Sequence, residues 1–227
     1  MKIAYIATSE IPSQKANSLQ VLKVCQALTQ AGEQVNLYVP GTGKVDIPAL
    51  NQAYGIEIRF PITRLPSRKA LRRFDFTWQS LRSARRADVD LVYTRMLWVA
   101  RLAQFMDLPV ILEMHDLPTG KFGPGLYKHF LRSKEHKLVV YITHALKRLA
   151  DEHSGCPADP AEAVIAPDGV DLERYAYLPS PKEARARLNL PEMITAAYSG
   201  SFYAGRGLEG LMELAVRFPQ VQFLWIG

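Results

Sequence analysis

The sequence lacks paired cysteines, a secretory signal, internal repeats and any long apolar run. Its two cysteines, Cys25 and Cys156, form no CxxC pair, which argues against a disulfide framework and against a thiolate zinc site. The apolar run 3–7 is too short for the core of a signal peptide. No run approaches the roughly 20 residues that span a bilayer. We therefore expect a cytoplasmic protein.

Net positive charge is confined to one segment of the 227-residue chain. The formal net charge is +6, and residues 68–86 contain seven Lys and Arg residues against Asp75 alone. Because the rest of the chain sums to zero, a general nucleic-acid binder is not expected. One helical stripe of the segment is apolar: Leu71, Phe74, Trp78 and Leu81. We expect this stripe to pack on a sheet, while the arginines favour peripheral contact with an anionic membrane at its inner face.

Short apolar runs rich in Ile, Val and Tyr alternate with segments of helical period. The expected strands are 2–7, 34–39, 56–60, 89–94, 109–113, 137–142 and 162–166. The expected helices are 18–31, 68–87, 95–106 and 144–153. Several strands are apolar almost throughout, which is typical of a parallel sheet covered on both faces. The alternation predicts a doubly wound, Rossmann-like α/β domain over residues 1–166.

The second half of the chain has a different pattern. Residues 167–194 contain four prolines and an Asp-Gly turn, so we expect a linker with a short helix. Residues 195–227 then form a single unit: a strand at 195–200, a helix at 207–217 and a strand at 221–226. One such unit cannot bury both faces of its strands, which indicates a truncated second domain. We expect its uncovered faces to self-associate or to be mobile.

A glycine-rich turn joins the first strand and the helix of this unit. It reads GSFYAGRG, and its candidate ligand-binding residues are Gly200, Ser201, Gly205 and Arg206. Backbone amides at a helix N-terminus, together with a guanidinium, form a site for a diphosphate. Such a site stabilises the negative charge that grows on a diphosphate when a sugar leaves its nucleotide. The alternative is a plain turn with a surface arginine, because short glycine motifs are common.

Polar residues also follow the expected strand 109–113. The segment Glu113-Met114-His115-Asp116 stands where that strand ends, and ligands bind at the carboxyl ends of strands in an open parallel sheet. A histidine there can orient a hydroxyl group or exchange a proton near neutral pH. The alternative is a structural histidine bonded to a backbone carbonyl.

Two further places are candidates for the same cleft. The first βα loop, 8–17, is longer than the usual loop of about 2–6 residues. It places Asn17 and Ser18 near the cleft at the helix start, although Ser18 could serve only as the helix N-cap. Arg95 follows an expected strand. It could contact an anionic or hydroxylated acceptor, or form a surface salt bridge.

Several segments, taken together, resemble one known family. They are KIAYIATSE, VLKVCQALTQAGEQVNLY, ILEMHD, YITHALKRLAD, IAPDGVDLERY and YSGSFYAGRGLEGLMEL. The resemblance is to the family 4 glycosyltransferases of the GT-B fold, which have two facing Rossmann-like domains. It implies an acceptor-side domain over 1–166 and the start of a nucleotide-sugar-binding domain over 195–227. It also implies retaining, hexosyltransferase-type transfer from a nucleotide-sugar donor to a glycan or lipid-linked acceptor, with no metal or cofactor.

The resemblance also implies roles for particular residues. His115 matches the histidine of the family's active site, near the sugar. Arg206 falls where the family usually has a lysine that binds the donor diphosphate. Residues 168–171, Asp-Gly-Val-Asp, match the usual Asn-Gly-Val-Asp, since either residue suits a tight turn.

The sequence departs from the family pattern at three places. Lys15-Ala16 stands where many members have Gly-Gly, and Ser201 replaces a common arginine. The family's pair of glutamates would lie beyond Gly227, so residues 1–227 alone are expected to be inactive. Two alternatives remain at this point: a GT-B sugar-nucleotide epimerase, and a truncated binding module that transfers nothing.

Overall fold

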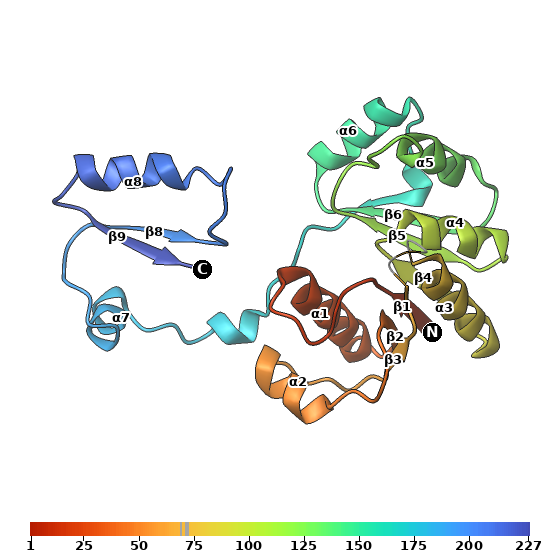
Figure 1. The fold of residues 1–227 in the computed structure, drawn as a ribbon, viewed down its shortest axis with the longest axis horizontal. Helices are drawn as coiled ribbons and strands as arrows, with labels where there is room; N and C mark the ends of the chain where they lie inside the picture. Colours follow the sequence, from red (N-terminus) through yellow and green to blue (C-terminus); the bar gives the residue numbers. More distant parts are fainter. Residues whose placement is uncertain (69, 71–72) are drawn as a thin grey trace. The chain divides into compact units, whose positions relative to one another are not determined.

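The structure is a computed structural model that describes residues 1–68, 70 and 73–227. The chain divides into two compact units, Met1–Asp168 and Gly169–Gly227 (Figure 1). Among the described residues, no helix has the length and apolar character needed to cross a membrane.

A seven-stranded sheet forms the centre of the first unit. Its strands are β1 (Lys2–Ile6), β2 (Gln34–Pro40), β3 (Ile62–Leu65), β4 (Leu91–Thr94), β5 (Val110–Met114), β6 (Lys137–Tyr141) and β7 (Ala163–Ile165). Their order is β3-β2-β1-β4-β5-β6-β7, and every neighbouring pair is parallel. This confirms the expected doubly wound α/β fold. The winding reverses between β1 and β4, and open α/β sheets bind ligands at such a point.

Helices cover both faces of this sheet (Figure 1). They are α1 (Ala16–Gln30), α2 (Ile47–Tyr54), α3 (Phe74–Arg86), α4 (Leu97–Phe105), α5 (Gly123–Arg132) and α6 (His144–Ser154). Successive side chains of a strand face opposite sides. Thus Ile3 and Tyr5 of β1 pack in one core cluster with α1 and α2, whereas Ala4 and Ile6 pack in the other with α3 to α6. Cys25 lies in the first cluster and is fully buried, as a plain core residue.

The strand expected at 56–60 is wrong, because the third strand begins at Ile62. The segment does bury every second residue, as the pattern predicts: Ile56, Ile58 and Phe60. The backbone amide of Ile58, however, donates to the side chain of Asn51 at 3.0 Å instead of pairing with β2. The helices α2 and α5 were also not expected from the sequence; both are short and have a proline in the first turn.

The helix expected at 68–87 is shorter and packs differently. Its buried residues are Phe76, Thr77, Ser80, Leu81 and Ala84. Phe74 and Trp78, expected in the buried stripe, are instead 48% and 50% exposed, and Leu71 lies outside the described residues. The hydroxyls of Thr77 and Ser80 bond to backbone carbonyls one turn earlier. Their hydroxyls are thus satisfied locally, so both residues can lie on the packed face beside Phe76 and Leu81. Phe74 and Trp78 lie off that face.

The second unit contains the expected strand–helix–strand. Its elements are η3 (Leu172–Tyr175), α7 (Pro181–Arg187), β8 (Thr195–Ser199), α8 (Leu208–Arg217) and β9 (Gln222–Ile226). The strands β8 and β9 are parallel. Helix α7 is the short helix expected in the linker, and Ser180 and Glu183 form a capping box at its start. None of the described residues of this unit is buried, so taken by itself it has no closed core.

Candidate functional site

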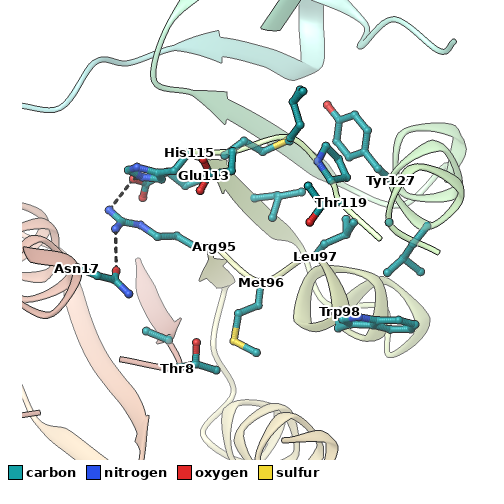
Figure 2. A pocket seen from close by; sticks show the side chains of 18 of the residues that line it. Thr8, Asn17, Arg95, Met96, Leu97, Trp98, Glu113, His115, Thr119 and Tyr127 are labelled. Atoms are coloured by element: carbon teal, nitrogen blue, oxygen red, sulfur yellow. Dashed lines mark hydrogen bonds and ion pairs between the residues drawn. The ribbon is translucent and has the colours of Figure 1, made fainter. Parts of the chain in front are cut away.

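A cavity of about 790 Å³ opens at the carboxyl ends of β1, β4 and β5 (Figure 2). Its wall consists of the residues after β1, the first turns of α1, the residues after β4, the segment after β5 and the start of α5. The cavity therefore lies at the reversal point of the sheet, where polar strand-end side chains meet.

The end of β5 places two titratable side chains on this cavity. Glu113 is the fourth residue of the strand and is only 5% exposed. His115 follows two residues later, so both side chains project to the same side. Nε2 of His115 lies 2.5 Å from Oε1 of Glu113. The histidine thus stands at the strand end, as expected, and its hydrogen-bond partner is a carboxylate and not a backbone carbonyl.

Arg95 reaches the same carboxylate from the neighbouring strand. Thr94 of β4 pairs with Leu112 of β5, so the next residues, Arg95 and Glu113, are adjacent. Nη2 of Arg95 donates to Oε1 of Glu113 at 2.7 Å. The two side chains are 14% and 6% exposed. Arg95 therefore forms an ion pair, but inside the cavity wall and not on the surface.

The first turn of α1 holds the other end of the guanidinium. Nη1 of Arg95 donates to Oδ1 of Asn17 at 3.2 Å and to Oε1 of Gln20 at 3.4 Å. Figure 2 shows Arg95 between Asn17 and the pair formed by Glu113 and His115. One arginine therefore joins α1, β4 and β5 at the mouth of the cavity.

Electrostatics favour the charged forms of this pair. Burial acts to raise the pKa of Glu113, but the hydrogen bond from His115 and the charge of Arg95 lower it by more, so the pKa lies below its ordinary value. Burial acts to lower the pKa of Arg95, yet the neighbouring Tyr5 and Glu113 raise it above its ordinary value. Both groups are therefore ionised at neutral pH.

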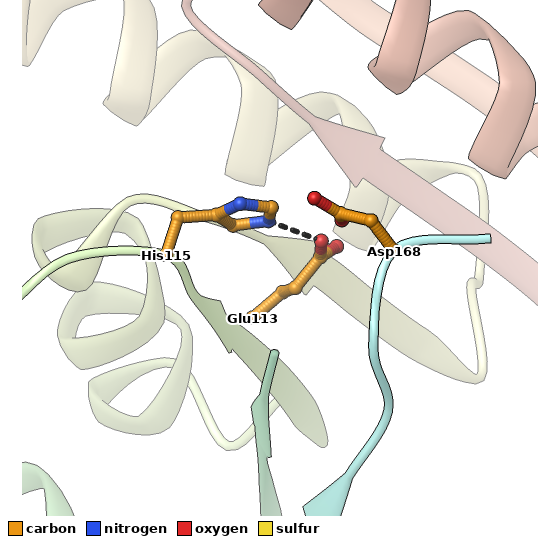
Figure 3. A group of neighbouring side chains, drawn as sticks. All are labelled: Glu113, His115 and Asp168. Carbon is orange, nitrogen blue, oxygen red and sulfur yellow. Dashed lines mark hydrogen bonds and ion pairs between the residues drawn. The ribbon is translucent and has the colours of Figure 1, made fainter. Parts of the chain in front are cut away.

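Asp168, the last residue of the first unit, lies close to these groups (Figure 3). One ligand atom each from Glu113, His115 and Asp168 lies within 4.8 Å of the others, and these residue types can coordinate a metal ion. The side-chain amide of Gln20 donates to Asp168. Oε1 of Glu113 is already shared by Arg95 and His115. Because the guanidinium charge repels a second cation at this oxygen, the arrangement favours an ion-pair network over a metal site.

The remaining candidates of the first unit have different positions. Asn17 and Asp116 line the cavity and are exposed. Ser18 is buried and is not part of the cavity wall. It is also not the N-cap, because α1 begins at Ala16 and Lys15 is its cap residue. The hydroxyl of Ser18 donates to the carbonyl of Glu10 at 2.9 Å, so this serine fixes the loop before α1.

The candidate donor-binding residues lie in the second unit, in the turn between β8 and α8. Gly205 and Gly207 have φ angles of 89° and 73°, which favour glycine, and Gly207 precedes the first residue of the helix. Gly200 and Ser201 follow β8 directly. The guanidinium of Arg206 lies 4.7 Å from the ring centroid of Tyr203 and donates to its hydroxyl. The turn therefore presents an exposed arginine next to a helix N-terminus.

Sequence reasoning assigned no role in the site to Gln20, Trp98, Glu113 or Asp168, although Glu113 belongs to the segment 113–116 and Asp168 to the turn 168–171. Glu113 carried a usable signal, since a carboxylate inside an apolar strand is rarely buried unless it is paired. Gln20 follows Asn17 by three positions, which places both on one helical face. Trp98 is 48% exposed and packs edge-to-face against Phe74 with ring centroids 5.3 Å apart. Nothing local in the sequence indicated that it lines a cavity.

Comparison with known proteins gives a family match over most of the chain. Residues 19–174 match the model of a family described as Glycosyltransferase Family 4. A phosphatidyl-myo-inositol mannosyltransferase of Mycolicibacterium smegmatis is 23% identical over 226 residues, which covers 91% of this chain and 54% of that protein. The chain thus spans about half the length of this curated relative.

Solved structures share the fold over nearly the whole chain. HepE of Anabaena, in complex with UDP and glucose, has a TM-score of 0.69 and 16% identity, covering 99% of this chain and 60% of its own. The UDP-GlcNAc 2-epimerase of Neisseria meningitidis, bound to UDP-GlcNAc, has a TM-score of 0.62 and 11% identity, covering 99% of this chain and 65% of its own. At these identities the likeness shows the fold alone.

Proposed function

Since the chain belongs to Glycosyltransferase Family 4, we propose that it transfers a sugar from a nucleotide-sugar donor to an acceptor held in the cavity of the first unit. The resemblance noted in the sequence is thereby confirmed at the level of the family. The observation that carries the proposal is His115, which lines the cavity at the carboxyl end of β5. A histidine at this place can orient a sugar hydroxyl and exchange a proton with it near neutral pH.

The donor would be bound through its diphosphate by the turn between β8 and α8. Backbone amides at the start of α8 and the guanidinium of Arg206 supply positive charge where the departing diphosphate becomes more negative. With this charge supplied by the protein, the transfer needs no metal or cofactor. HepE, which shares the fold, binds UDP and glucose. We propose retention of configuration and a hexose as the transferred sugar, from the resemblance to the family.

The acceptor would be a glycan or a lipid-linked sugar. The cavity wall offers polar groups from Asn17 and Asp116 and an aromatic surface from Trp98, and sugars use both kinds of contact. The relative is named a phosphatidyl-myo-inositol mannosyltransferase, and a name that refers to a lipid supports the proposal of a lipid-linked acceptor.

A lipid-linked acceptor agrees with peripheral contact between this protein and a membrane. Helix α3 exposes the aromatic rings of Phe74 and Trp78, together with Arg82, Arg85 and Arg86. Aromatic rings and arginines on one helix suit the headgroup region of an anionic bilayer. We place this contact on the side of the first unit that α3 forms.

A direct test uses the gene product that carries these 227 residues. It is incubated with UDP-, GDP- and ADP-sugars, with and without glycan and lipid-linked acceptors, and products are identified by mass spectrometry. Release of nucleotide with a sugar added to an acceptor is the expected result. Conversion of the nucleotide sugar into its epimer without any acceptor would instead establish an epimerase. A folded protein that acts on none of these donors would overturn the proposal in favour of a binding module.

A further inference from the structure

We infer that Glu113 is a positioning residue for His115, holding the imidazole by Nε2 so that Nδ1 is presented to a sugar hydroxyl in the cavity. The inference rests on the proposed function, because it states how the histidine of that site meets its substrate. Neither the sequence pattern nor the resemblance assigned any role to Glu113.

The proton arrangement follows from the contact between the two side chains. An ionised carboxylate only accepts hydrogen bonds, so the 2.5 Å contact requires a proton on Nε2 of His115. A neutral imidazole carries one proton, which leaves a lone pair on Nδ1. In the described part of the chain Nδ1 has no hydrogen-bond partner, and His115 lines the cavity with its side chain 22% exposed. Nδ1 can therefore accept a hydrogen bond from a hydroxyl group in the cavity.

The carboxylate is itself held rigidly. Arg95 bonds to the same oxygen, Oε1, at 2.7 Å and keeps Glu113 ionised. Asn17 and Gln20 in turn accept from the other end of the guanidinium. The orientation of the imidazole is therefore set by groups from β4, β5 and α1. A side chain restrained in this way before substrate binds loses little entropy on binding.

A purely structural Glu113 would predict different behaviour. If its only task were to neutralise Arg95, the contact with His115 would be incidental and the ring free to rotate. The Nε2 proton would then exchange with water at the rate of an exposed histidine. The other four histidines, His129, His136, His144 and His153, are exposed and serve as internal references for that rate.

The first test is NMR of the uniformly ¹⁵N-labelled chain, which needs no activity. We expect the neutral ring of His115 to show a low-field Nε2 proton that exchanges slowly, and an unprotonated Nδ1. The signals are assigned by their loss in His115→Gln. In Glu113→Gln the proton should move upfield and exchange faster. A proton on Nδ1, or exchange as fast as that of the four reference histidines in the wild-type chain, would overturn the inference even if the variant fails to fold.

The second test is a double-mutant cycle in the transfer assay. Glu113→Gln should lower kcat by about 10²–10⁴-fold, no more than His115→Ala, because that range is the typical contribution of an acid–base group. The double variant should be no slower than His115→Ala, since a positioning residue has nothing to act on once the imidazole is gone. Losses that multiply would show an independent role and contradict the inference. Absence of any transfer by the gene product that carries these 227 residues would refute the proposed function, while the NMR result would still decide the role of Glu113.

Discussion

Arg95 donates a 2.7 Å hydrogen bond to Glu113, and both side chains lie almost fully inside the wall of the cavity. A charged pair in such a place is costly to break, because removal of one partner leaves the other charge buried and uncompensated. The pair also connects β4 to β5 at the edge of the sheet where the substrate would bind. Loss of this ion pair should therefore both destabilise the first unit and disturb the cavity wall.

Arg95→Met should destabilise the first unit by about 3–5 kcal/mol, the usual effect of breaking a buried ion pair from one side. The matched control is Arg59→Met, because Arg59 pairs with Glu57 at 2.8 Å but the two side chains are 72% and 61% exposed. Urea unfolding followed by circular dichroism measures both. Equal, small losses for the two variants would show that the ion pair of Arg95 contributes no more than a surface pair.

The lowered pKa of Glu113 predicts a specific acid sensitivity. A carboxyl group with a depressed folded pKa contributes stability that is present above its unfolded pKa and is lost as pH falls through its folded pKa. The free energy of unfolding should therefore drop below about pH 5, and drop less steeply in Glu113→Gln. Urea titrations at a series of pH values between neutral and acid measure these slopes. Parallel curves for the two proteins would mean that the pKa of Glu113 does not change on folding.

The proposed membrane contact predicts binding that depends on salt. Each Lys or Arg near an anionic surface contributes about 1 kcal/mol, and this attraction is screened as ionic strength rises. We expect the protein to float with phosphatidylserine vesicles at low salt and to detach at high salt. Replacement of Arg82, Arg85 and Arg86 by Gln should abolish flotation. The same change in charge at Arg132, Lys134 and Arg148, which are exposed on α5 to α6, should leave it intact.

Absence of flotation at low salt, or flotation that high salt does not change, would contradict a contact through α3. Equal losses in the two triple variants would show that only net charge matters. Trp78→Ser separates the aromatic contribution, because it removes a half-exposed ring without changing the charge.

The proposed binding of the donor by the second unit predicts weak donor binding by residues 1–227 alone. The turn at Gly205 and Arg206 can hold a diphosphate, but the described residues around it form only a two-stranded sheet with one helix. Calorimetric titration with UDP- and GDP-sugars should give no micromolar binding, and no transfer should follow. Arg206→Ala should weaken whatever diphosphate binding remains, whereas Arg217→Ala, at the far end of α8, should not. Micromolar affinity together with multiple turnovers would refute this division.

The fold of the first unit could be predicted from sequence where the strands are apolar almost throughout. The strands β1, β2 and β4 to β7 are nearly continuous apolar runs, and a short run of this kind between turns is typical of a buried parallel strand. The strand predicted at 56–60 is wrong because alternate residues can be buried without strand pairing. The backbone amide of Ile58 donates to the side chain of Asn51 and not to a neighbouring strand. On α3 the buried face includes Thr77 and Ser80, whose hydroxyls bond locally to backbone carbonyls. Phe74 and Trp78 therefore lie outside that face, although both are large and apolar.

The candidate site could be predicted only in part, because most of its contacts join residues from different strands and helices. His115 was found from its place at a strand end, which is a local feature. The hydrogen bond from Arg95 to Glu113 depends on the register of β4 against β5, and this register cannot be read from the residues of either strand. Asp168 is far from both in sequence and reaches the cluster through the chain path after β7. Contacts of this range become visible only when the strands are placed side by side.

Turnover of the His115→Ala variant of the gene product that carries these 227 residues, with a nucleotide sugar and acceptor, decides whether this cavity is an active site. We expect kcat to fall by about 10²–10⁴-fold, with a thermal midpoint close to that of the wild-type protein, because His115 lies at the cavity wall and outside the packed core. Near wild-type turnover in the folded variant would contradict the assignment of this cavity as the active site.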